Sequence, residues 1–353
     1  MSHTSHQECK ARLSKEIQQR QARGMWRATL ATLATFVSLA VGPPLAAQEI
    51  PSAETNAAPA AASLNGVTYV AWTGKSGPPD SIWYYSSASG SQHEISGTSS
   101  SIAAPALASN GSTLYLAWNS EGYIYCCMTN TGSTWTATSD EPVSDDGDYA
   151  ETAAAPALAV SGSSMYLAWL NLTTNGVEFA SNTGSGWNFS PIPKNPGGAS
   201  AGKAPALAVY GDTIFLAWLP AESSQISYAT CSLPCSAWSG PFSVPGTATS
   251  GPALGVDAYN SSLYLAWTSG GTISYSEYNV ASAGWNPPTA VTGLSAVAPP
   301  APALVSNTVV EPCGSGFFPD NTFSVVYASP GPPAGGYYDL YMHTLFNNLG
   351  RCM

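Results

Sequence analysis

Hydrophobic and polar positions along the chain repeat in a cycle of about 49 residues. Each cycle contains Pro-Ala-Leu-Ala or a close variant, a short turn, and a segment ending in Ala-Trp or a variant of it, as at residues 105–108 and 114–118. The prolines that start the cycles are Pro59, Pro105, Pro156, Pro205, Pro252 and Pro302. Self-similarity at a fixed period of this length indicates a repeat architecture, in which each cycle forms one supersecondary unit.

Within each cycle the hydrophobic period is two, which indicates strands rather than helices. Leu114, Leu116 and Trp118 alternate with Tyr115 and Ala117, as expected for a strand that is buried on both faces. A third strand-like segment follows in each cycle, and a second tryptophan opens a fourth one at Trp135, Trp187, Trp238 and Trp285. Four antiparallel strands repeated six times predict an all-β fold, a six-bladed β-propeller. The repeats cover about residues 57–102, 103–153, 154–202, 203–249, 250–298 and 299–353.

The two ends of the repeat array complement each other. The last cycle has no tryptophan-led fourth strand, whereas residues 49–53 resemble the end of the fourth strand that precedes Pro252. An open last blade would leave unpaired strand edges. We therefore expect the N-terminal segment to supply the outer strand of the last blade. A ring of seven blades is the alternative, although no stretch of residues remains to build a seventh.

Two turn segments carry a family resemblance. Residues 129–135 and 181–187 resemble degenerate Asp-box (BNR) turns of sialidase-type propellers, with Thr131 and Thr183 in place of the defining aspartate. The whole cycle is also similar to propeller lectins of the tachylectin and PLL-like kind. Both resemblances imply a propeller fold, and the second implies carbohydrate binding. Propellers host many functions, so the resemblance specifies the architecture more closely than the activity.

Residues 1–47 have the order of a secretory signal. A basic stretch precedes an apolar run at residues 28–41, and Pro43, Pro44 and small residues follow. We expect cleavage near Ala47, which leaves residues 48–353 as a single propeller domain that is secreted, periplasmic or at the cell surface. About fourteen apolar residues are too few to cross a bilayer, which needs about twenty. A retained membrane anchor is the alternative, and Met25 as well as Met1 could start the chain.

The charge balance excludes one large class of partners. Only 4 of the 10 basic residues but 19 of the 21 acidic residues follow residue 47. Nucleic-acid binding depends on Lys and Arg side chains that neutralise phosphates. This part of the chain is therefore not expected to bind nucleic acid, and anionic membrane surfaces are unfavourable for the same reason.

The cysteines suggest disulfides, since exported proteins meet an oxidising environment. Cys231 and Cys235 are close enough to clip a hairpin, and Cys313 could pair with Cys352 in the last repeat. Cys126 and Cys127 are adjacent in a predicted strand, where successive side chains point to opposite faces. We therefore expect no bond between those two.

The sequence favours binding over catalysis. Sialidases hold a substrate carboxylate with three arginines, but after residue 47 only Arg351 is present, which argues strongly against that chemistry. A Ser–His–Asp triad is equally disfavoured, because only His93 and His343 follow the signal and no nucleophile-elbow motif is present. The 19 acidic residues permit a glycoside hydrolase or polysaccharide lyase of sialidase-like fold, which remains an alternative.

Candidate ligand-binding residues lie where the repeats differ. They fall in the third strand or in the connection before it: Asp80, Trp83, Glu121, Tyr123, Asn171, Glu178, Glu222 and Gln225. An aromatic ring beside a carboxylate or amide suits a neutral sugar, whose CH face stacks while its hydroxyls form hydrogen bonds. These positions predict a non-catalytic, lectin-like propeller with several weak sites for neutral glycans or glycoconjugates. A protein-interaction or cell-surface scaffold is the alternative.

An acidic segment lies between the second and third repeats. Its oxygen ligands, Asp145, Asp146, Asp148 and Glu151, could gather a calcium ion. Their spacing matches no standard calcium loop, so a solvated linker is the simpler interpretation. No other cofactor is expected.

Overall fold

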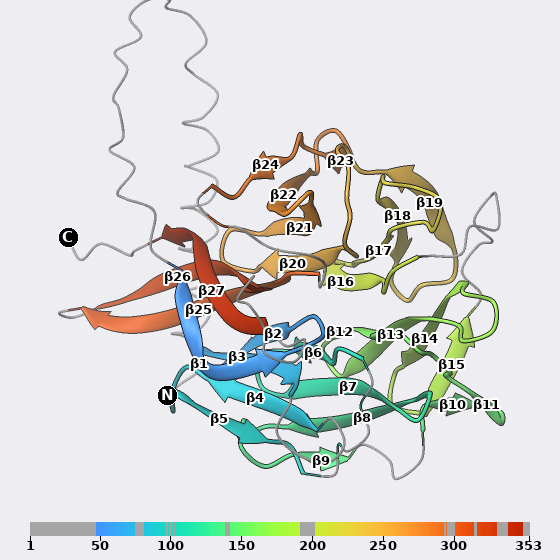
Figure 1. Ribbon diagram of the computed structural model, residues 1–353, viewed down its shortest axis with the longest axis horizontal. Helices are drawn as coiled ribbons and strands as arrows, with labels where there is room; N and C mark the ends of the chain where they lie inside the picture. The colour runs from blue at the N-terminus through green and yellow to red at the C-terminus, as the bar shows by residue number, and fades with distance from the viewer. Residues whose placement is uncertain are drawn as a thin grey trace, which may run out of the picture. The chain divides into compact units, whose positions relative to one another are not determined.

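The computed structural model describes residues 47–74, 81–96, 98, 101, 103–137, 142–190, 202–292, 294, 301–313, 316–329 and 338–348 (Figure 1). Within these ranges the chain forms strands and turns and no helix. No helix long and apolar enough to cross a lipid bilayer is therefore found there. The predicted signal segment up to residue 46, Asp80 and Cys352 lie outside the described residues.

Six antiparallel sheets of four strands account for the repeats. Blade 1 consists of β2 (Ala60–Leu64), β3 (Val67–Thr73), β4 (Ile82–Ser86) and β5 (Ser91–Glu94), and blade 2 of β6 (Ala106–Ser109), β7 (Leu114–Ser120), β8 (Tyr123–Thr129) and β9 (Thr136–Ala137). Blade 3 consists of β12 (Ala157–Ser161), β13 (Ser164–Leu170), β14 (Val177–Asn182) and β15 (Trp187–Ser190), and blade 4 of β16 (Ala206–Tyr210), β17 (Thr213–Trp218), β18 (Ser227–Ser232) and β19 (Trp238–Ser243).

The last two blades depart slightly from this plan. Blade 5 consists of β20 (Ala253–Asp257), β21 (Ser262–Ser269), β22 (Thr272–Asn279) and β23 (Gly284–Trp285), with β24 (Thr289–Ala290) also pairing with β22. Blade 6 consists of β25 (Ala303–Cys313), β26 (Gly316–Ala328), β27 (Tyr338–Asn348) and β1 (Gln48–Thr55). Between blades 2 and 3 the chain forms a small hairpin, β10 (Ser144–Asp145) and β11 (Asp148–Tyr149).

The innermost strands form a closed ring. β2, β6, β12, β16, β20 and β25 each contact the next in this order, and β25 contacts β2 again. Figure 1 shows them around a common centre, with the other strands of each blade outside them. The fold is a six-bladed β-propeller, so the predicted architecture is confirmed and the seven-bladed alternative is wrong.

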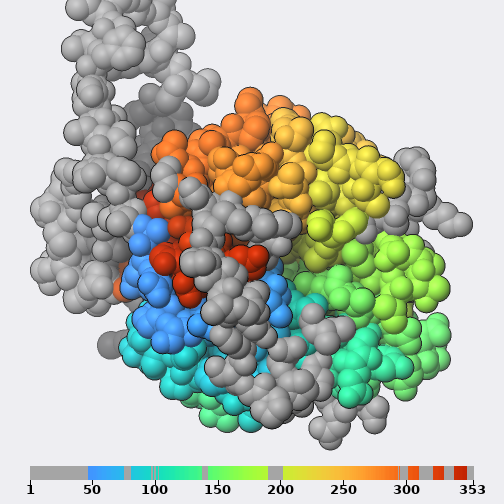
Figure 2. Space-filling model, in the orientation of Figure 1, coloured from blue at the N-terminus to red at the C-terminus, as the bar shows by residue number. Residues whose placement is uncertain are grey.

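The first strand closes the last blade, as the sequence predicts. β1 pairs antiparallel with β27, with Gln48 opposite Met342 and Thr55 opposite Tyr338. The register shifts between Glu49 and Glu54, where Ser52 has a φ of 56°. Figure 2 shows the first described residues, in blue, directly against the last ones, in red. Pairing between distant parts of the chain covers the edge that blade 6 would otherwise expose.

The hydrophobic core lies between the blades. Each of six clusters combines side chains from two neighbouring blades, because both faces of every inner strand are apolar. The tryptophans that end the second strands lie in these clusters and are all buried: Trp72, Trp118, Trp169, Trp218 and Trp267. Each faces the preceding blade, and Tyr327 takes this place in blade 6. These side chains therefore pack the interfaces between blades.

The second set of tryptophans packs farther out on the preceding blade. Trp135 contacts Tyr84, Trp238 contacts Phe179 and Trp285 contacts Tyr228, edge to face at centroid distances of 5.9, 5.1 and 5.9 Å. Trp187 packs on the cluster between blades 2 and 3. There Cys126 takes the position that an aromatic residue, Tyr84, Phe179 or Tyr228, has in the other three contacts. These contacts join the outer strands of neighbouring blades.

Four cysteines have the states that the sequence predicts. Cys231 and Cys235 form a disulfide in the turn between β18 and β19. Cys126 and Cys127 are buried and not bonded to each other, and burial raises the pKa of the Cys126 thiol to about 12. The predicted Cys313–Cys352 pair involves a residue outside the described ranges, so it stays a prediction.

Candidate functional site

Strand direction sorts the connections onto two faces of the ring. The six repeat prolines lead into the innermost strands on one face, here called the proline face. Because successive strands are antiparallel, the connections between second and third strands also lie on this face. The turns between first and second strands, such as Asn65-Gly66, lie on the opposite face, here called the hairpin face. The candidate residues of the β3–β4, β7–β8, β13–β14 and β17–β18 connections thus belong to the proline face.

Two cavities lie along the centre of the ring. The one on the proline face, of about 130 Å³, is lined by proline, alanine and leucine side chains. The one on the hairpin face is larger, about 590 Å³, and includes serine, threonine and asparagine in its lining. Six residues, one from each innermost strand, line both cavities: Ala61, Leu107, Leu158, Leu207, Leu254 and Leu304. These six residues therefore mark the boundary between the two cavities.

Trp83 of blade 1 lies opposite Trp72 and packs into the cluster between blades 6 and 1. Its ring leaves no room for a side chain at position 74, where an added Cβ would lie 2.5 Å from Cδ1 of Trp83. Trp83 is thus half-buried, and much of its side chain packs against neighbouring residues. Asp80, its predicted neighbour in a sugar site, lies outside the described residues.

In blade 2, Glu121 and Gly122 form the exposed turn between β7 and β8, both with positive φ. Tyr123 follows and is half-buried, and its ring meets that of Tyr149 edge to face at 5.7 Å. Tyr123 is also bridged to Glu151 through the backbone. The acidic segment after blade 2 therefore returns to the connection between β7 and β8.

That acidic segment forms a small hairpin between blades 2 and 3, and residues 146–149 are exposed to solvent. Asp146 and Gly147 form the turn between β10 and β11, with φ values of 49° and 91°. The carboxylate of Asp145 accepts a hydrogen bond of 2.7 Å from the backbone N–H of Phe189 in blade 3. Across the described ranges, no three carboxylate, thiol or imidazole side chains are placed to hold a metal ion. Calcium binding by Asp145, Asp146, Asp148 and Glu151 stays a prediction.

In blade 3, Asn171 and Glu178 are in direct contact. The amide nitrogen of Asn171 donates a 2.9 Å hydrogen bond to Oε1 of Glu178. Its carbonyl oxygen accepts from the backbone N–H groups of Thr173 and Thr174, which fixes the side chain. Burial raises the pKa of the Glu178 carboxyl; the Asn171 hydrogen bond partly offsets this, while the charge of Asp148 adds to it.

The candidates in blade 4 lie apart from these groups. Glu222 and Gln225 are exposed in the connection between β17 and β18. The side-chain amide of Gln225 donates to the backbone carbonyl of Val244 at 3.2 Å. Nothing in the described residues connects them with the candidates of blades 2 and 3.

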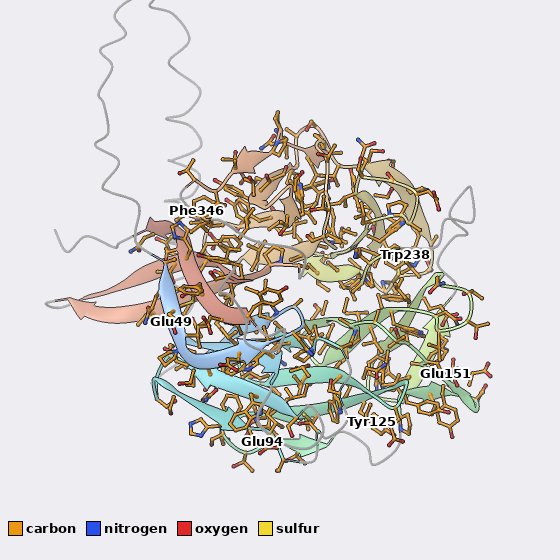
Figure 3. All side chains as sticks on the ribbon, viewed as in Figure 1. Glu49, Glu94, Tyr125, Glu151, Trp238 and Phe346 are labelled. Carbon is orange, nitrogen blue, oxygen red and sulfur yellow. A yellow bond between two sulfur atoms is a disulfide. The ribbon has the colours of Figure 1, made fainter. Side chains whose placement is uncertain are left out.

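The structure gathers one cluster at the junction of blades 2 and 3, on the proline face. Leu172 N–H donates to the carbonyl of Glu151 at 3.1 Å, and Thr152 N–H to that of Gly122 at 2.8 Å, so the β10–β11 hairpin is held between the two blades. Figure 3 labels Glu151 beside this hairpin. We call Tyr123, Tyr149, Glu151, Asn171, Leu172 and Glu178 the Tyr149 cluster.

Two members of the Tyr149 cluster were not predicted from the sequence. Tyr149 and Leu172 are each 46% exposed, which is unusual for large hydrophobic residues in this protein. Tyr149 lies in the segment between the second and third repeats, whereas Leu172 directly follows Asn171 in the β13–β14 connection. The repeat pattern therefore pointed to the region of Leu172 but not to Tyr149.

Comparisons with known proteins find similar solved structures but no related sequence. No protein-family model matches the chain, and no curated protein is similar to it at a significant level. Among solved structures, the chain is similar to TolB from Acinetobacter baumannii, with 10% identity over 68% of this chain and a TM-score of 0.44, and it spans 55% of the length of that protein. It is also similar to YjhT, with 13% identity, coverage of 80% and 97% of the two chains and a TM-score of 0.45.

A leech intramolecular trans-sialidase complexed with 2,7-anhydro-Neu5Ac is a third similar structure. Its identity is 9% over 81% of this chain and 67% of that protein, with a TM-score of 0.47. At these identities the similarity concerns the fold and does not extend to the activity.

Proposed function

We propose that this propeller binds neutral glycans without catalysing a reaction, and that the Tyr149 cluster is its principal site. The supporting observation is the placement of a half-exposed tyrosine beside fixed hydrogen-bond acceptors. Tyr149 is braced edge to face by Tyr123, while Asn171 and Glu178 form a hydrogen-bonded pair nearby. An aromatic face can stack on the CH face of a sugar, and carboxylate oxygens accept hydrogen bonds from its hydroxyls.

The surrounding charge selects against anionic sugars. Asp148, Glu151 and Glu178 contribute to the site or its border, and blades 2 and 3 contain no Lys or Arg within the described ranges. A sulfated or sialylated ligand would meet like charge there without a cation to pair with. A neutral ligand avoids this repulsion, and its hydroxyls are suitable donors to the carboxylates.

The cluster points to one principal site. Among the described residues, the β10–β11 hairpin that supplies Tyr149 is the only two-stranded sheet outside the blades. The several similar sites that the repeats predict at Trp83, Glu222 and Gln225 would therefore be weaker ones. Multivalent binding would then arise from many glycan copies on a surface rather than from many strong sites on the protein.

A glycan array with a matched pair of variants tests this function. Tyr149→Ala should weaken neutral-glycan binding about tenfold or more, which is about 1.4 kcal/mol, because the stacking surface is lost. Tyr259→Ala is the control, since Tyr259 is equally exposed at 46% but belongs to blade 5. Tyr149→Phe should retain most of the binding. If neutral glycans give no signal with the unaltered protein, a scaffold function is the better interpretation.

Glycoside hydrolysis is the second candidate, and one observation favours it. The Glu178 carboxyl has a raised pKa and lies within the electrostatic reach of Asp148. A glycosidase needs such a pair, one acid that keeps its proton and one ionised carboxylate. Release of reducing sugar from a neutral polysaccharide, abolished in Glu178→Gln, would establish the enzyme function in place of simple binding.

We also propose that the protein is exported. The Cys231–Cys235 disulfide supports this, because disulfides persist mainly outside the cytosol. The basic and apolar order of residues 1–47 adds a second argument from the sequence. N-terminal sequencing of exported protein should find Gln48 first. A mature protein that still begins at Met1 or Met25 would contradict the cleavage.

A further inference from the structure

The larger central cavity, on the hairpin face, is open because every side chain around it is small or aliphatic. It is lined by residues of all six blades and has a volume of about 590 Å³. Small-molecule sites commonly have volumes of about 300–1,000 Å³. Its described lining includes no charged and no aromatic side chain. The volume of the cavity is suitable for a small ligand, and the polarity of its lining determines which chemical groups that ligand must carry.

The polarity of the wall is divided into two halves. At one repeated position of the innermost strands, blades 6, 1 and 2 have Ser306, Ser63 and Ser109. Blades 3, 4 and 5 have Val160, Val209 and Val256 at the same position. Three consecutive blades therefore have serine, and the other three valine, at the same level of the cavity wall. All six residues are half-buried, and the valines also pack partly on the clusters between blades. The turn residues Asn65 and Asn110, together with Thr308 of β25, add to the polar half.

A buried network holds the hydroxyls of blade 6 in one orientation. Ser306 and Thr308 donate to Oδ1 of Asn321, at 3.2 and 2.9 Å. Asn321, which is 1% exposed, donates in turn to the carboxylate of Asp257 at 3.0 Å. Asp257 is fully buried and also accepts from the side chain of Asn260 at 2.6 Å. The carboxylate is thus satisfied within the protein.

This orientation determines what the polar half can bind. A hydroxyl has one proton to donate, and those of Ser306 and Thr308 are directed to Asn321. Their oxygen lone pairs remain, so the hydroxyls act toward the cavity as hydrogen-bond acceptors. A matching ligand must supply O–H or N–H donors on one side. Positions fixed by a second layer of hydrogen bonds bind with less loss of entropy.

We propose that the hairpin-face cavity is a second binding site, which takes a neutral, hydroxyl-bearing small molecule with one apolar side, such as a 6-deoxyhexopyranoside. The hydroxyls of the ligand donate to the serine and threonine oxygens of blades 6, 1 and 2. Its CH or methyl side lies against Val160, Val209 and Val256. A charged ligand is disfavoured, because the lining has no counter-charge to replace its lost hydration.

This site is independent of the Tyr149 cluster. The two lie on opposite faces of the ring and share no residue. The cavity proposal therefore does not depend on the proposed glycan-binding function. Each can fail while the other holds.

Calorimetric titration with methyl α-L-fucopyranoside tests the cavity, with the whole protein as it folds. Thr308→Val keeps the shape of the side chain and removes one acceptor, so affinity should fall about tenfold. Thr213→Val is the matched control, because Thr213 is also a half-buried threonine of a blade strand but does not line the cavity. Ser63→Val is a second variant that the fold should accept, since valine occupies this position in three blades.

The outcomes separate the two proposals. Binding that is weakened by Thr308→Val and Ser63→Val, and unchanged in Thr213→Val and Tyr149→Ala, supports the cavity site. Binding that is lost only in Tyr149→Ala assigns the sugar to the proline face and overturns the cavity proposal. No heat of binding at millimolar sugar overturns it as well, whatever the glycan array shows.

Discussion

Closure of the ring by β1 can be tested through a single side chain. Ile50 lies on β1, is 2% exposed, and packs in the cluster between blades 6 and 1 with Val70 and Leu340. Replacement by alanine removes three carbon atoms from a buried site that is packed by side chains of both blades. Such large-to-small substitutions cost about 2–5 kcal/mol, so about 3 kcal/mol is expected for Ile50→Ala.

The expected change in melting temperature follows from the size of the domain. About 2.1 cal/mol/K per residue over roughly 300 residues makes the unfolding entropy about 0.6 kcal/mol/K. A loss of about 3 kcal/mol should therefore lower the melting temperature by about 5 °C. Differential scanning calorimetry of the unaltered protein and the variant, at several scan rates, measures this shift.

The control is Val280→Ala, because Val280 is 65% exposed and should change the melting temperature by less than 1 °C. If Ile50→Ala behaves like this control, β1 does not pack between blades 6 and 1. A large shift for Ile50→Ala alone supports closure of the ring by the N-terminal strand.

Three further predictions concern ionisable groups and the disulfide. Because the pKa of Glu178 is raised in the folded state, the native protein holds this proton more tightly than the unfolded chain does. The free energy of unfolding should therefore fall as the pH rises from about 4.5, the pKa in the unfolded chain, through the pKa of the folded protein. Glu178→Gln should remove this pH dependence in urea titrations at pH 4 to 7. Replacing Cys231 and Cys235 by serine opens a loop of about five residues, which should lower the free energy of unfolding by about 2 kcal/mol. The denaturant concentration at the unfolding midpoint should fall, and an unchanged midpoint would contradict this. The buried, weakly acidic thiols of Cys126 and Cys127 should react with iodoacetamide only after unfolding, as mass spectrometry can show.

The architecture was predictable because the same sequence pattern recurs in every blade. The recurring prolines and Ala-Trp ends mark equivalent points in every blade, and the missing fourth strand of the last repeat matches the spare segment at residues 49–53. Two details differ: β9 is only Thr136–Ala137 and begins after Trp135, and β23 is only Gly284–Trp285 and ends at Trp285. A single strand boundary depends on local pairing, which periodicity does not specify.

The candidate site was less predictable, because it depends on contacts between the β10–β11 hairpin and the connections of blades 2 and 3. The variable position of the third strand lies directly opposite the buried tryptophans, as Trp83 does to Trp72 and Tyr125 to Trp118. Tyr125 stacks on Trp118 at 5.7 Å, so variation there reflects packing as well as exposure. Only the three-dimensional structure shows that the hairpin carrying Tyr149 returns to Tyr123 and Leu172.

The pairing of β1 with β27 also has a consequence for the time course of biosynthesis. Gln48 and Met342, which lie side by side in the sheet, are separated by about 290 residues. A ribosome adding roughly 5–20 residues per second makes the later strand about 15–60 s after the earlier one. Throughout that interval β1 lacks its partner strand β27, and its unpaired edge is available to holding chaperones, to proteases and to the strands of other nascent copies. Such a long wait predicts slow maturation, consistent with a fold dominated by non-local pairing.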